Sequence, residues 1–341
     1  MFNELLTDRL IVRGFVASDA PLLQARRNDP EVSLYQNWER PFSRENANAI
    51  VQSLMAMDGP TDGEWWMATI CDRVTGEVVG DLSVELTWDG RSAEIGYNLD
   101  RRFWGCGYAA EAAEAFVRYL FEQEHATRVF GMLHPDNTAS AQVLERCGLV
   151  FEGHTRLSYW DDDGPSDDWI YGSTAEAWRK WDSRKKTAPS EVLLVPVTIH
   201  NERKVARLKT HKSQEAFVAP VLASYADALF PEIVDGSPVS PILRAIEADG
   251  EVVGFVMVAD TTVAHPEPFL WRFLIDRMHQ RRGIGSMALN AVVAERSAAG
   301  DSTLVTSWQE GRGTPAPFYR SHGFVETGRE IDGETEARLT F

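Results

Sequence analysis

The sequence contains one succession of elements twice, and this internal repeat constrains the fold more than any other feature. Each copy has an apolar strand, a glycine-containing loop, an alanine-rich helix, a second strand, a short helix and a turn that begins with glycine. The loop glycine and the turn glycine are Gly107 and Gly148 in the first copy, 41 residues apart, and Gly283 and Gly323 in the second, 40 residues apart. This matched spacing predicts two related domains.

The periodicity of the apolar residues assigns the elements within each copy. In the first copy the expected ranges are a strand at 93–99, the loop at 104–109, a helix at 109–120, a strand at 128–133 and a helix at 139–146. In the second copy they are a strand at 269–275, the loop at 280–285, a helix at 287–295, a strand at 303–308 and a helix at 316–321. Hairpin-like strands enter through a Gly-Glu-Val-Val-Gly segment in both halves, at 76–80 and 250–254. We therefore predict an α/β fold of two tandem domains, each a mixed, mostly antiparallel twisted sheet with helices on both faces.

A change in charge and composition indicates the boundary between the domains. Residues 1–182 hold 16 basic and 31 acidic residues, a net charge of −15, whereas the remainder holds 18 and 20, a net charge of −2. The segment 183–191 is basic, small and proline-containing, as linkers often are. We predict an N-terminal domain at 1–182, a linker at 183–191 and a C-terminal domain at 192–341.

The overall composition excludes several classes of protein. A net charge of −17 over 341 residues argues against nucleic acid and anionic membranes as partners and favours cationic ones, such as amines. The three cysteines, Cys71, Cys106 and Cys147, form neither a disulfide framework nor a zinc motif, and we expect no metal. The longest apolar runs are far shorter than a membrane span and the start is unlike a signal peptide, which predicts a cytoplasmic protein.

The two glycine loops suit a pyrophosphate. Glycines between a strand and a helix let backbone N–H groups converge, because no side chain intervenes and positive φ angles are allowed. The N-terminus of the following helix adds partial positive charge. A single loop of this kind is equally typical of a plain tight turn, but two copies at matched spacing favour the binding function.

These residues resemble the GNAT superfamily of acyl-CoA-dependent N-acetyltransferases, over nearly the whole chain outside the linker. Gln280-Arg-Arg-Gly-Ile-Gly285 fits the pyrophosphate loop of that superfamily, and Trp104-Gly-Cys-Gly-Tyr-Ala109 fits it except for the tryptophan in first position. The first half is similar to ribosomal-protein-alanine acetyltransferases, through segments that include Leu6–Leu10, Glu94–Tyr97, Asn137–Ser140 and Leu144–Gly148. The second half resembles bacterial spermine/spermidine acetyltransferases, through Gln214–Val218, Trp271–Asp276 and Phe318-Tyr319.

The resemblance implies acetyl-CoA as co-substrate and a set of residues that hold it. In the second half these are Leu274, Ile275, Gln280, Arg281, Arg282, Gly283, Ile284, Gly285 and Ser286. In the first half they are Tyr97, Asn98, Trp104, Gly105, Cys106, Gly107, Tyr108, Ala109 and Asn137. The strand residues Tyr97, Asn98, Leu274 and Ile275 are expected to contribute backbone groups. Asn137 is equally suited to cap the helix that follows it.

The resemblance also implies direct attack of a neutral amine on the thioester, which needs an acid for the leaving thiolate. Tyr319, four residues before Gly323, stands where the family places that acid; the alternative is a packed aromatic residue with its hydroxyl hydrogen-bonded. The corresponding residue in the first half is Leu144, which has no proton to donate. Ser140, on the same short helix, is a weaker candidate, with capping of the helix backbone as the alternative.

The attacking amine must first lose a proton, since an alkylamine has a pKa of about 10.4. Glu94 is the candidate base of the first half, on the strand expected beside the thioester; the alternative is a residue on the solvated face of that strand. In the second half no carboxylate stands out, and Glu247 and Asp276 are each more typical of structural positions. The acidic stretch 161–168 is expected to be a solvated hairpin loop, with recruitment of a cationic substrate as the alternative.

We predict from these observations an N-acetyltransferase that acts on a small-molecule or peptide amine, as a monomer or homodimer. A polyamine-like acceptor in the second half is preferred, because that half keeps both the complete loop and Tyr319. Acetylation of an aminated antibiotic or of a peptide N-terminus by the first half is the alternative among enzymes. A non-catalytic, CoA-binding regulatory protein is the alternative from another class.

Overall fold

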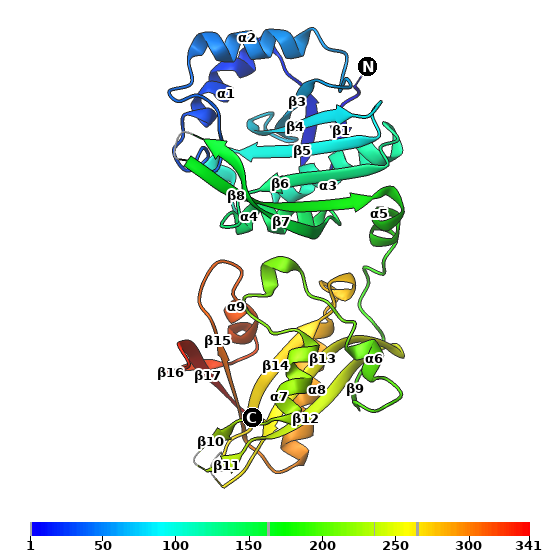
Figure 1. Cartoon of the computed structure of the whole chain (residues 1–341), viewed down its shortest axis with the longest axis vertical. Helices are drawn as coiled ribbons and strands as arrows, with labels where there is room; N and C mark the ends of the chain where they lie inside the picture. Colours follow the sequence, from blue (N-terminus) through cyan, green and yellow to red (C-terminus); the bar gives the residue numbers. More distant parts are fainter. Residues whose placement is uncertain (1, 162–163, 235, 264–265) are drawn as a thin grey trace. The chain divides into compact units, whose positions relative to one another are not determined.

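The computed structural model describes residues 2–161, 164–234, 236–263 and 266–341. The chain divides into two compact units, Met1–Asp182 and Ser183–Phe341, and each has its own main β-sheet (Figure 1). The segment 183–191 is bound to the second unit. The side chain of Arg282 donates to the Thr187 carbonyl (2.8 Å), and the backbone N–H groups of Ser190 and Glu191 donate to Asp249 Oδ1 (2.9 and 3.2 Å).

The sheet of the first unit has eight strands in the order β1-β2-β3-β4-β5-β6-β8-β7. The strands are β1 (Leu5–Leu6), β2 (Leu10–Gly14), β3 (Trp65–Asp72), β4 (Val78–Thr87), β5 (Ser92–Leu99), β6 (Arg128–Leu133), β7 (Val150–Asp161) and β8 (Gly164–Thr174). Its helices are α1 (Ala20–Arg27), α2 (Arg44–Met55), α3 (Tyr108–Glu122), α4 (Thr138–Arg146) and α5 (Ala175–Asp182). All neighbouring strands are antiparallel except β5 and β6, which are parallel.

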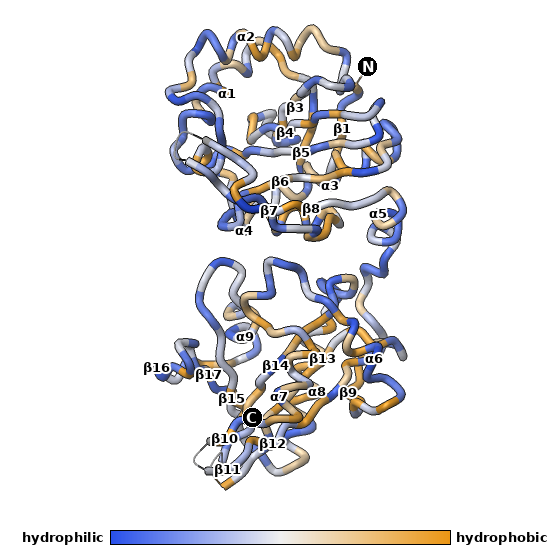
Figure 2. The backbone as a smooth tube through the Cα atoms, viewed as in Figure 1, coloured by the Kyte–Doolittle hydropathy of each residue, from blue (hydrophilic) through white to orange (hydrophobic). Residues whose placement is uncertain are grey.

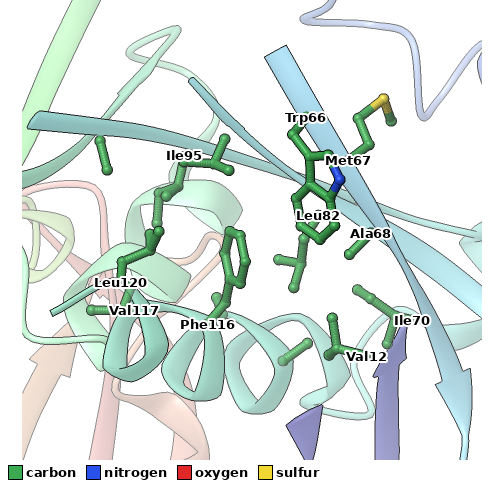
Figure 3. Close-up of a cluster of buried hydrophobic side chains, with 14 of the residues drawn as sticks. Val12, Trp66, Met67, Ala68, Ile70, Leu82, Ile95, Phe116, Val117 and Leu120 are labelled. Carbon is green, nitrogen blue, oxygen red and sulfur yellow. The ribbon is translucent and has the colours of Figure 1, made fainter. Parts of the chain in front are cut away.

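The expected helical stripe forms the core between α3 and the sheet. Phe116, Val117 and Leu120 have no exposed surface and point from α3 toward Trp66, Leu82 and Ile95 on the strands (Figure 3). Successive residues of a strand point to opposite faces of the sheet, so the residues next to Trp66, Leu82 and Ile95 in the sequence lie on the face away from α3. Met67 lies on that face (Figure 3), which is the face covered in part by α1 and α2 (Figure 1).

The second unit repeats this arrangement with a seven-stranded sheet in the order β16-β17-β15-β14-β13-β12-β9. Its strands are β9 (Val192–Pro196), β12 (Ser240–Ala248), β13 (Glu251–Asp260), β14 (Phe269–Ile275), β15 (Thr303–Trp308), β16 (Val325–Ile331) and β17 (Glu334–Thr340). A small hairpin, β10 (Ile233–Val234) and β11 (Ser237–Pro238), is separate from this sheet. The helices are α6 (Glu202–Val205), α7 (Val221–Leu229), α8 (Ile284–Ala298) and α9 (Ala316–Ser321).

Apolar residues cover both faces of this second sheet. Ile284, Ala288 and Val292 of α8 pack in one buried cluster, whereas Val205 of α6 and Val221 of α7 belong to a cluster on the other side. The central strands accordingly appear as the most hydrophobic part of this unit (Figure 2). Among the described residues, no helix combines the length and the apolar character needed to cross a membrane.

In both units the single parallel strand pair opens into a wedge. Strands β5 and β6 pair only at Ser92–Glu94 with Arg128–Phe130, and β14 pairs with β15 only at Phe269 with Val305. Beyond these pairs, residues 95–99 of β5 and 270–275 of β14 have no paired neighbour on that side. Each wedge therefore presents strand backbone that is not paired with the next strand, although the carbonyls of Leu99, Leu270 and Ile275 accept hydrogen bonds from side chains.

The second glycine of each Gly-Glu-Val-Val-Gly segment fits closely against the strand at the wedge. A Cβ atom at Gly80 would overlap the Asn98 carbonyl oxygen and the Leu99 side chain, and one at Gly254 would lie 2.6 Å from the Leu274 carbonyl oxygen. Neither glycine has a positive φ. Close approach of the neighbouring backbone thus requires glycine at both positions.

We expect Gly80→Ala to lower the free energy of unfolding by about 1–3 kcal/mol, because the added methyl group forces the β4 and β5 backbones apart. Gly14→Ala is the matched control, since a Cβ atom there meets nothing within 4 Å. Chemical denaturation of the full chain measures both. Equal stability of the two variants would contradict the close approach.

Candidate active site

A cavity of about 720 Å³ lies at the wedge of the first unit. Its lining includes five residues that the sequence singles out, Glu94, Tyr97, Asn98, Asn137 and Ser140. They come from β5 on one side of the wedge and from the start of α4 on the other. Leu144, the counterpart of Tyr319, lines the same cavity. The expected site residues of the first half, other than the glycine loop, are thus brought together.

Glu94 is half-buried and lines this cavity where the wedge begins. Burial raises the pKa of its carboxyl group above the usual value, and the negative charges of Glu85 and Asp168 raise it further. Glu85 lies directly opposite Glu94 in the antiparallel β4–β5 pair. A carboxylate with a raised pKa is a stronger base than one in water, as proton removal from an amine requires. The position is therefore not a freely solvated strand face.

Tyr97, Ser140 and Asn137 form one hydrogen-bonded group. The Tyr97 hydroxyl donates to the Ser140 carbonyl (2.8 Å) and lies 2.8 Å from Ser140 Oγ. Asn137 caps α4, since its Oδ1 accepts from the Ser140 N–H (3.1 Å). The alternative that Ser140 itself caps the helix is thus wrong, because Asn137 already occupies the capping position. Burial raises the pKa of Tyr97 far above its usual value, so this hydroxyl keeps its proton.

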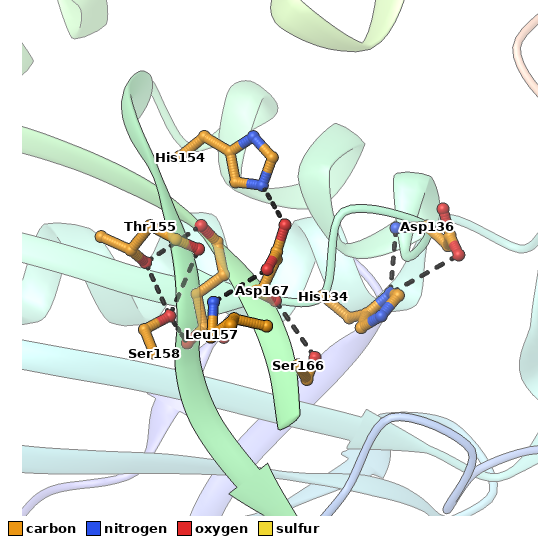
Figure 4. A network of polar contacts seen from close by, with 9 residues as sticks. His134, Asp136, His154, Thr155, Leu157, Ser158, Ser166 and Asp167 are labelled. Atoms are coloured by element: carbon orange, nitrogen blue, oxygen red, sulfur yellow. Dashed lines mark hydrogen bonds and ion pairs between the residues drawn. The ribbon is translucent and has the colours of Figure 1, made fainter. Parts of the chain in front are cut away.

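In the acidic stretch 161–168, residues 164–168 belong to strand β8. The expectation that the whole stretch is a solvated loop is wrong for Asp168. Asp168 is only 8% exposed, lines the cavity and accepts from Ser158 Oγ (2.8 Å). Asp167 bonds His154 Nε2 and the Leu157 N–H (2.8 and 2.9 Å; Figure 4). Residues 162 and 163 lie outside the described residues. Strand pairing between β7 and β8 explains the difference, because it turns Asp168 toward the cavity.

The glycine loop of the first unit precedes α3, and its side chains do not line this cavity. Gly107 is the residue before α3, with φ of 80° and no side-chain cap, so the first N–H groups of the helix have no capping side chain among the described residues. Arg9 braces the loop: it pairs with Glu111 on α3 (2.6 Å) and donates to the Cys106 carbonyl (2.9 Å). Tyr108 donates to Asp72 (3.2 Å), and its ring lies under the Arg9 guanidinium.

The tryptophan in the first loop reproduces the hydrogen bond that glutamine makes in the second. Trp104 Nε1 donates to the Leu99 carbonyl (3.0 Å), and Gln280 Nε2 donates to the Ile275 carbonyl (2.9 Å). Each donor lies five residues after its acceptor in the sequence. The acceptors, Leu99 and Ile275, are the last residues of β5 and β14. Trp104 therefore holds the loop to the strand as Gln280 does, and the departure from the family pattern leaves the loop geometry intact.

A second cavity, of about 340 Å³, lies at the glycine loop of the second unit. The expected residues that line it are Ile275, Gln280, Arg281, Gly283, Ile284, Gly285, Ser286 and Tyr319. Gly283 precedes α8 with φ of 76° and, like Gly107, has no side-chain cap among the described residues. The loop and the proposed acid thus share one cavity in this unit.

Tyr319 is both packed and in contact with the cavity. Its ring stacks on Trp308 (centroids 5.7 Å apart) and meets Phe318 and Phe324 edge-on. The hydroxyl is hydrogen-bonded to Thr306, and burial raises the pKa of Tyr319 to about 12. Tyr319 consequently stays protonated at neutral pH, as a proton donor must. The packed arrangement expected as an alternative and the catalytic one are compatible.

Three expected residues of the second half point away from its cavity. Leu274 is 4% exposed and packs in the apolar cluster beneath α6 and α7. Arg282 is 5% exposed, bonded to Thr187 and to His279 Nδ1 (3.1 Å). Asp276 accepts from the Met278 and Lys209 N–H groups (2.9 and 2.8 Å), which is a structural role. Leu274 and Arg282 can therefore contact a ligand in this cavity only through their backbone atoms. No carboxylate of the described residues lines this cavity.

The first cavity includes functional candidates that pattern reasoning missed. Arg27, at the end of α1, lines the cavity together with Glu94, and Tyr35 and Trp38 of the segment after α1 line it as well. The Tyr35 ring stacks on His134 (5.1 Å, 18°). These residues lie outside both repeated segments, and the aromatic-rich composition near Trp38 was the only sequence signal for them.

Comparisons with known proteins agree with the repeat of two domains. Models of the GNAT acetyltransferase domain match residues 9–150 and 242–326. The chain is 32% identical over 172 residues to the uncharacterized N-acetyltransferase YoaA of Bacillus subtilis, covering 50% of this chain and 96% of that protein. It is 32% identical over 163 residues to the FsC-acetyl coenzyme A-N(2)-transacetylase of Aspergillus fumigatus, covering 44% and 67%.

Among solved structures, spermidine N-acetyltransferase from Vibrio cholerae, in complex with CoA and spermine, is similar at 16% identity. The match covers 51% of this chain and 99% of that one, with a TM-score of 0.45. With both domain models matched and with a relative covered over nearly its whole length, the chain belongs to the GNAT acetyltransferase family and is an N-acetyltransferase with two such domains in tandem.

Proposed function

We propose that the first unit transfers the acetyl group of acetyl-CoA to a primary amine by direct attack, with Glu94 as the general base. The observation that carries this proposal is the placement of Glu94. It lines the larger cavity, where the wedge begins, with a raised pKa. Transfer from acetyl-CoA to an amine is the reaction of the family; the roles of individual residues are our proposal.

The geometry of the wedge supports each step of this reaction. The pantetheine and the thioester lie along the open edge of β5, where the backbone of Tyr97 and Asn98 pairs with β4 but not with β6. Glu94 removes the ammonium proton, directly or through water, and the neutral amine attacks the thioester carbon. Backbone N–H groups of the open strand stabilise the oxyanion that forms. As the C–S bond breaks, Ser140 is the proposed proton donor for the leaving thiolate and regains a proton from the nitrogen of the tetrahedral intermediate, since Ser140 lines the cavity and its hydroxyl is hydrogen-bonded to Tyr97.

We propose that the same reaction occurs in the second unit, with Tyr319 as the general acid. The supporting observation is that Tyr319 lines the cavity formed by the complete glycine loop. A polyamine-like acceptor remains our proposal for this unit. The negative charge of Glu334 adds to the rise in the pKa of Tyr319.

Both glycine loops fit the CoA pyrophosphate, because each precedes a helix whose first N–H groups have no side-chain cap. Cys106 is an exposed free thiol within the first loop. We expect CoA at about ten times its Kd to slow alkylation of Cys106 roughly tenfold, by occupying the loop. Peptide mass spectrometry measures the rate, with the buried Cys71 and Cys147 as internal controls. An unchanged rate at saturating CoA would contradict binding at the first loop.

Release of free thiol from acetyl-CoA, measured across a panel of amines, tests the proposed function. The panel includes spermidine, simple diamines, alkylamines, aminoglycosides and short peptides. Activity that Glu94→Gln abolishes belongs to the first unit, and activity that Tyr319→Phe abolishes belongs to the second. No release with any amine, despite demonstrable CoA binding, would instead favour a non-catalytic, CoA-binding role.

A further inference from the structure

The first cavity has opposite charges at its two ends. Arg27 contacts Met67 on β3, whereas Glu94 lies on β5 and the buried Asp168 lies on β8, both farther along the sheet order. Arg27 is held by ring contacts, with its guanidinium carbon 4.8 Å from the Trp38 ring centre and 4.7 Å from that of Phe42. Its position is therefore fixed by packing, and the residue is part of the cavity lining.

The Arg27 guanidinium has hydrogen-bond donors left for a ligand. Its one protein contact as a donor among the described residues is Met67 Sδ, at 3.8 Å, which is a weak acceptor. No carboxylate of the described residues forms an ion pair with it; burial lowers its pKa, and the negative charge of Asp81 offsets this lowering only in part. The neighbouring Arg26, by contrast, pairs with Asp81 at 2.8 Å. A desolvated guanidinium without an anion is costly, and a ligand that brings an anion removes that cost.

The strand register gives the distance between the two charged ends. Met67 pairs with Ser83, and Ser83 pairs with Gly96, so these three residues lie in one row across β3, β4 and β5 on the face that carries Glu94. Neighbouring strands are about 4.8 Å apart, and the wedge lies about half a spacing beyond β5, so an amine there is roughly 12 Å from Arg27. With an anion bound to Arg27 through a charge-assisted bond of about 2.8 Å, roughly 9 Å remains between the anion and the amine.

We infer that the acceptor of the first unit is an ω-amino carboxylate, whose carboxylate binds Arg27 and whose amine lies between Glu94 and the wedge. This inference rests on the proposed function of the first unit and names its substrate class. A separation of roughly 9 Å corresponds to an amine nitrogen and a carboxylate oxygen joined through about five methylene groups, as at the side-chain amine of a lysine with a free α-carboxylate. A polyamine fits this cavity less well, because a second cation would face Arg27.

The test compares ω-amino acids with unsubstituted alkylamines of the same chain length, using the full chain. We expect kcat/KM to peak at 6-aminohexanoate, above both 4-aminobutanoate and 8-aminooctanoate, and to exceed that of hexylamine. Arg27→Met keeps the packed stem and removes the charge. We expect it to lower the preference for 6-aminohexanoate over hexylamine by about 10- to 100-fold. Arg27→Lys restores part of that preference, because it keeps the positive charge.

Arg44→Met is the matched control, since Arg44 is exposed on α2 and does not line the cavity. The inference is overturned if hexylamine is the better substrate in the wild type, or if Arg27→Met lowers activity on both amines equally. Calorimetric binding of 6-aminohexanoate to the CoA-saturated protein is the second measurement. Binding that Arg27→Met weakens supports the inference even if no amine is acetylated, a result that would contradict only the proposed function. Binding that is absent, or equal in both proteins, overturns the inference.

Discussion

Glu94→Gln is expected to lower kcat of the first unit by about 10²- to 10⁴-fold, the range that general acid–base catalysis contributes. Glutamine has nearly the same shape as glutamate and accepts no proton from an amine. Since the pKa of Glu94 is raised in the fold, the carboxylate form is destabilised at neutral pH, and removing it should leave the protein as stable or more stable. Loss of activity with an unchanged or higher Tm would therefore identify a chemical effect and not a folding defect.

The pH dependence of kcat/KM gives an independent check of Glu94. A base must be deprotonated, so activity falls as the pH decreases through its pKa, which is raised above the usual glutamate value. Asp168→Asn removes one of the charges that raise this pKa, and we expect the acidic limb to move to lower pH. Glu45→Gln, on an exposed residue of α2, is the control and should leave the profile unchanged. An acidic limb at the same pH in Asp168→Asn would argue against Glu94 as the base.

Tyr319→Phe is the second large effect, with an expected loss of about 10²-fold in kcat of the second unit, measured in the Glu94→Gln background. Phenylalanine keeps the ring between Trp308, Phe318 and Phe324, so the affinity for acetyl-CoA should change little. Because the pKa of Tyr319 is about 12, its proton is retained at any pH that the protein tolerates. We therefore expect no alkaline limb from this residue below about pH 11.

Tyr225→Phe is the matched control in the same unit. Its hydroxyl donates to the Glu202 carbonyl (3.1 Å), and the residue does not line the second cavity. Both substitutions remove one hydrogen-bonded hydroxyl, so each is expected to lower the free energy of unfolding by about 1 kcal/mol. Equal turnover of the two variants with the best acceptor would contradict the role of Tyr319 and leave the second unit as a CoA-binding domain.

The repeated elements could be predicted from the sequence because their signals are local. The strands expected at 128–133 and 303–308 are confirmed residue for residue; they are β6 and β15. The helical stripe on α3 and the two glycine loops follow from periodicity and from backbone freedom within a few residues. These signals need no knowledge of what packs against the segment.

The composition of the cavities could not be predicted in the same way. Arg27, Asp168 and Glu94 are far apart in the sequence and meet only because β3, β4, β5 and β8 adopt one register. A shift of one residue in any of these pairings would turn the side chain to the other face of the sheet. The acidic stretch 161–168 was expected in solvent for this reason, since its composition says nothing about which aspartate faces inward.

The sequence by itself determined the family, the two-domain organisation and the loop at each helix start, since these depend on short-range spacing and backbone conformation. Only the tertiary structure decided which side chains share a cavity. It showed that Trp104 makes the hydrogen bond of Gln280, that Arg282 turns away from the second cavity, and that Arg27 faces the first one. Those outcomes depend on long-range strand register and on competition among buried groups for partners, and neither is encoded within a single segment of the chain.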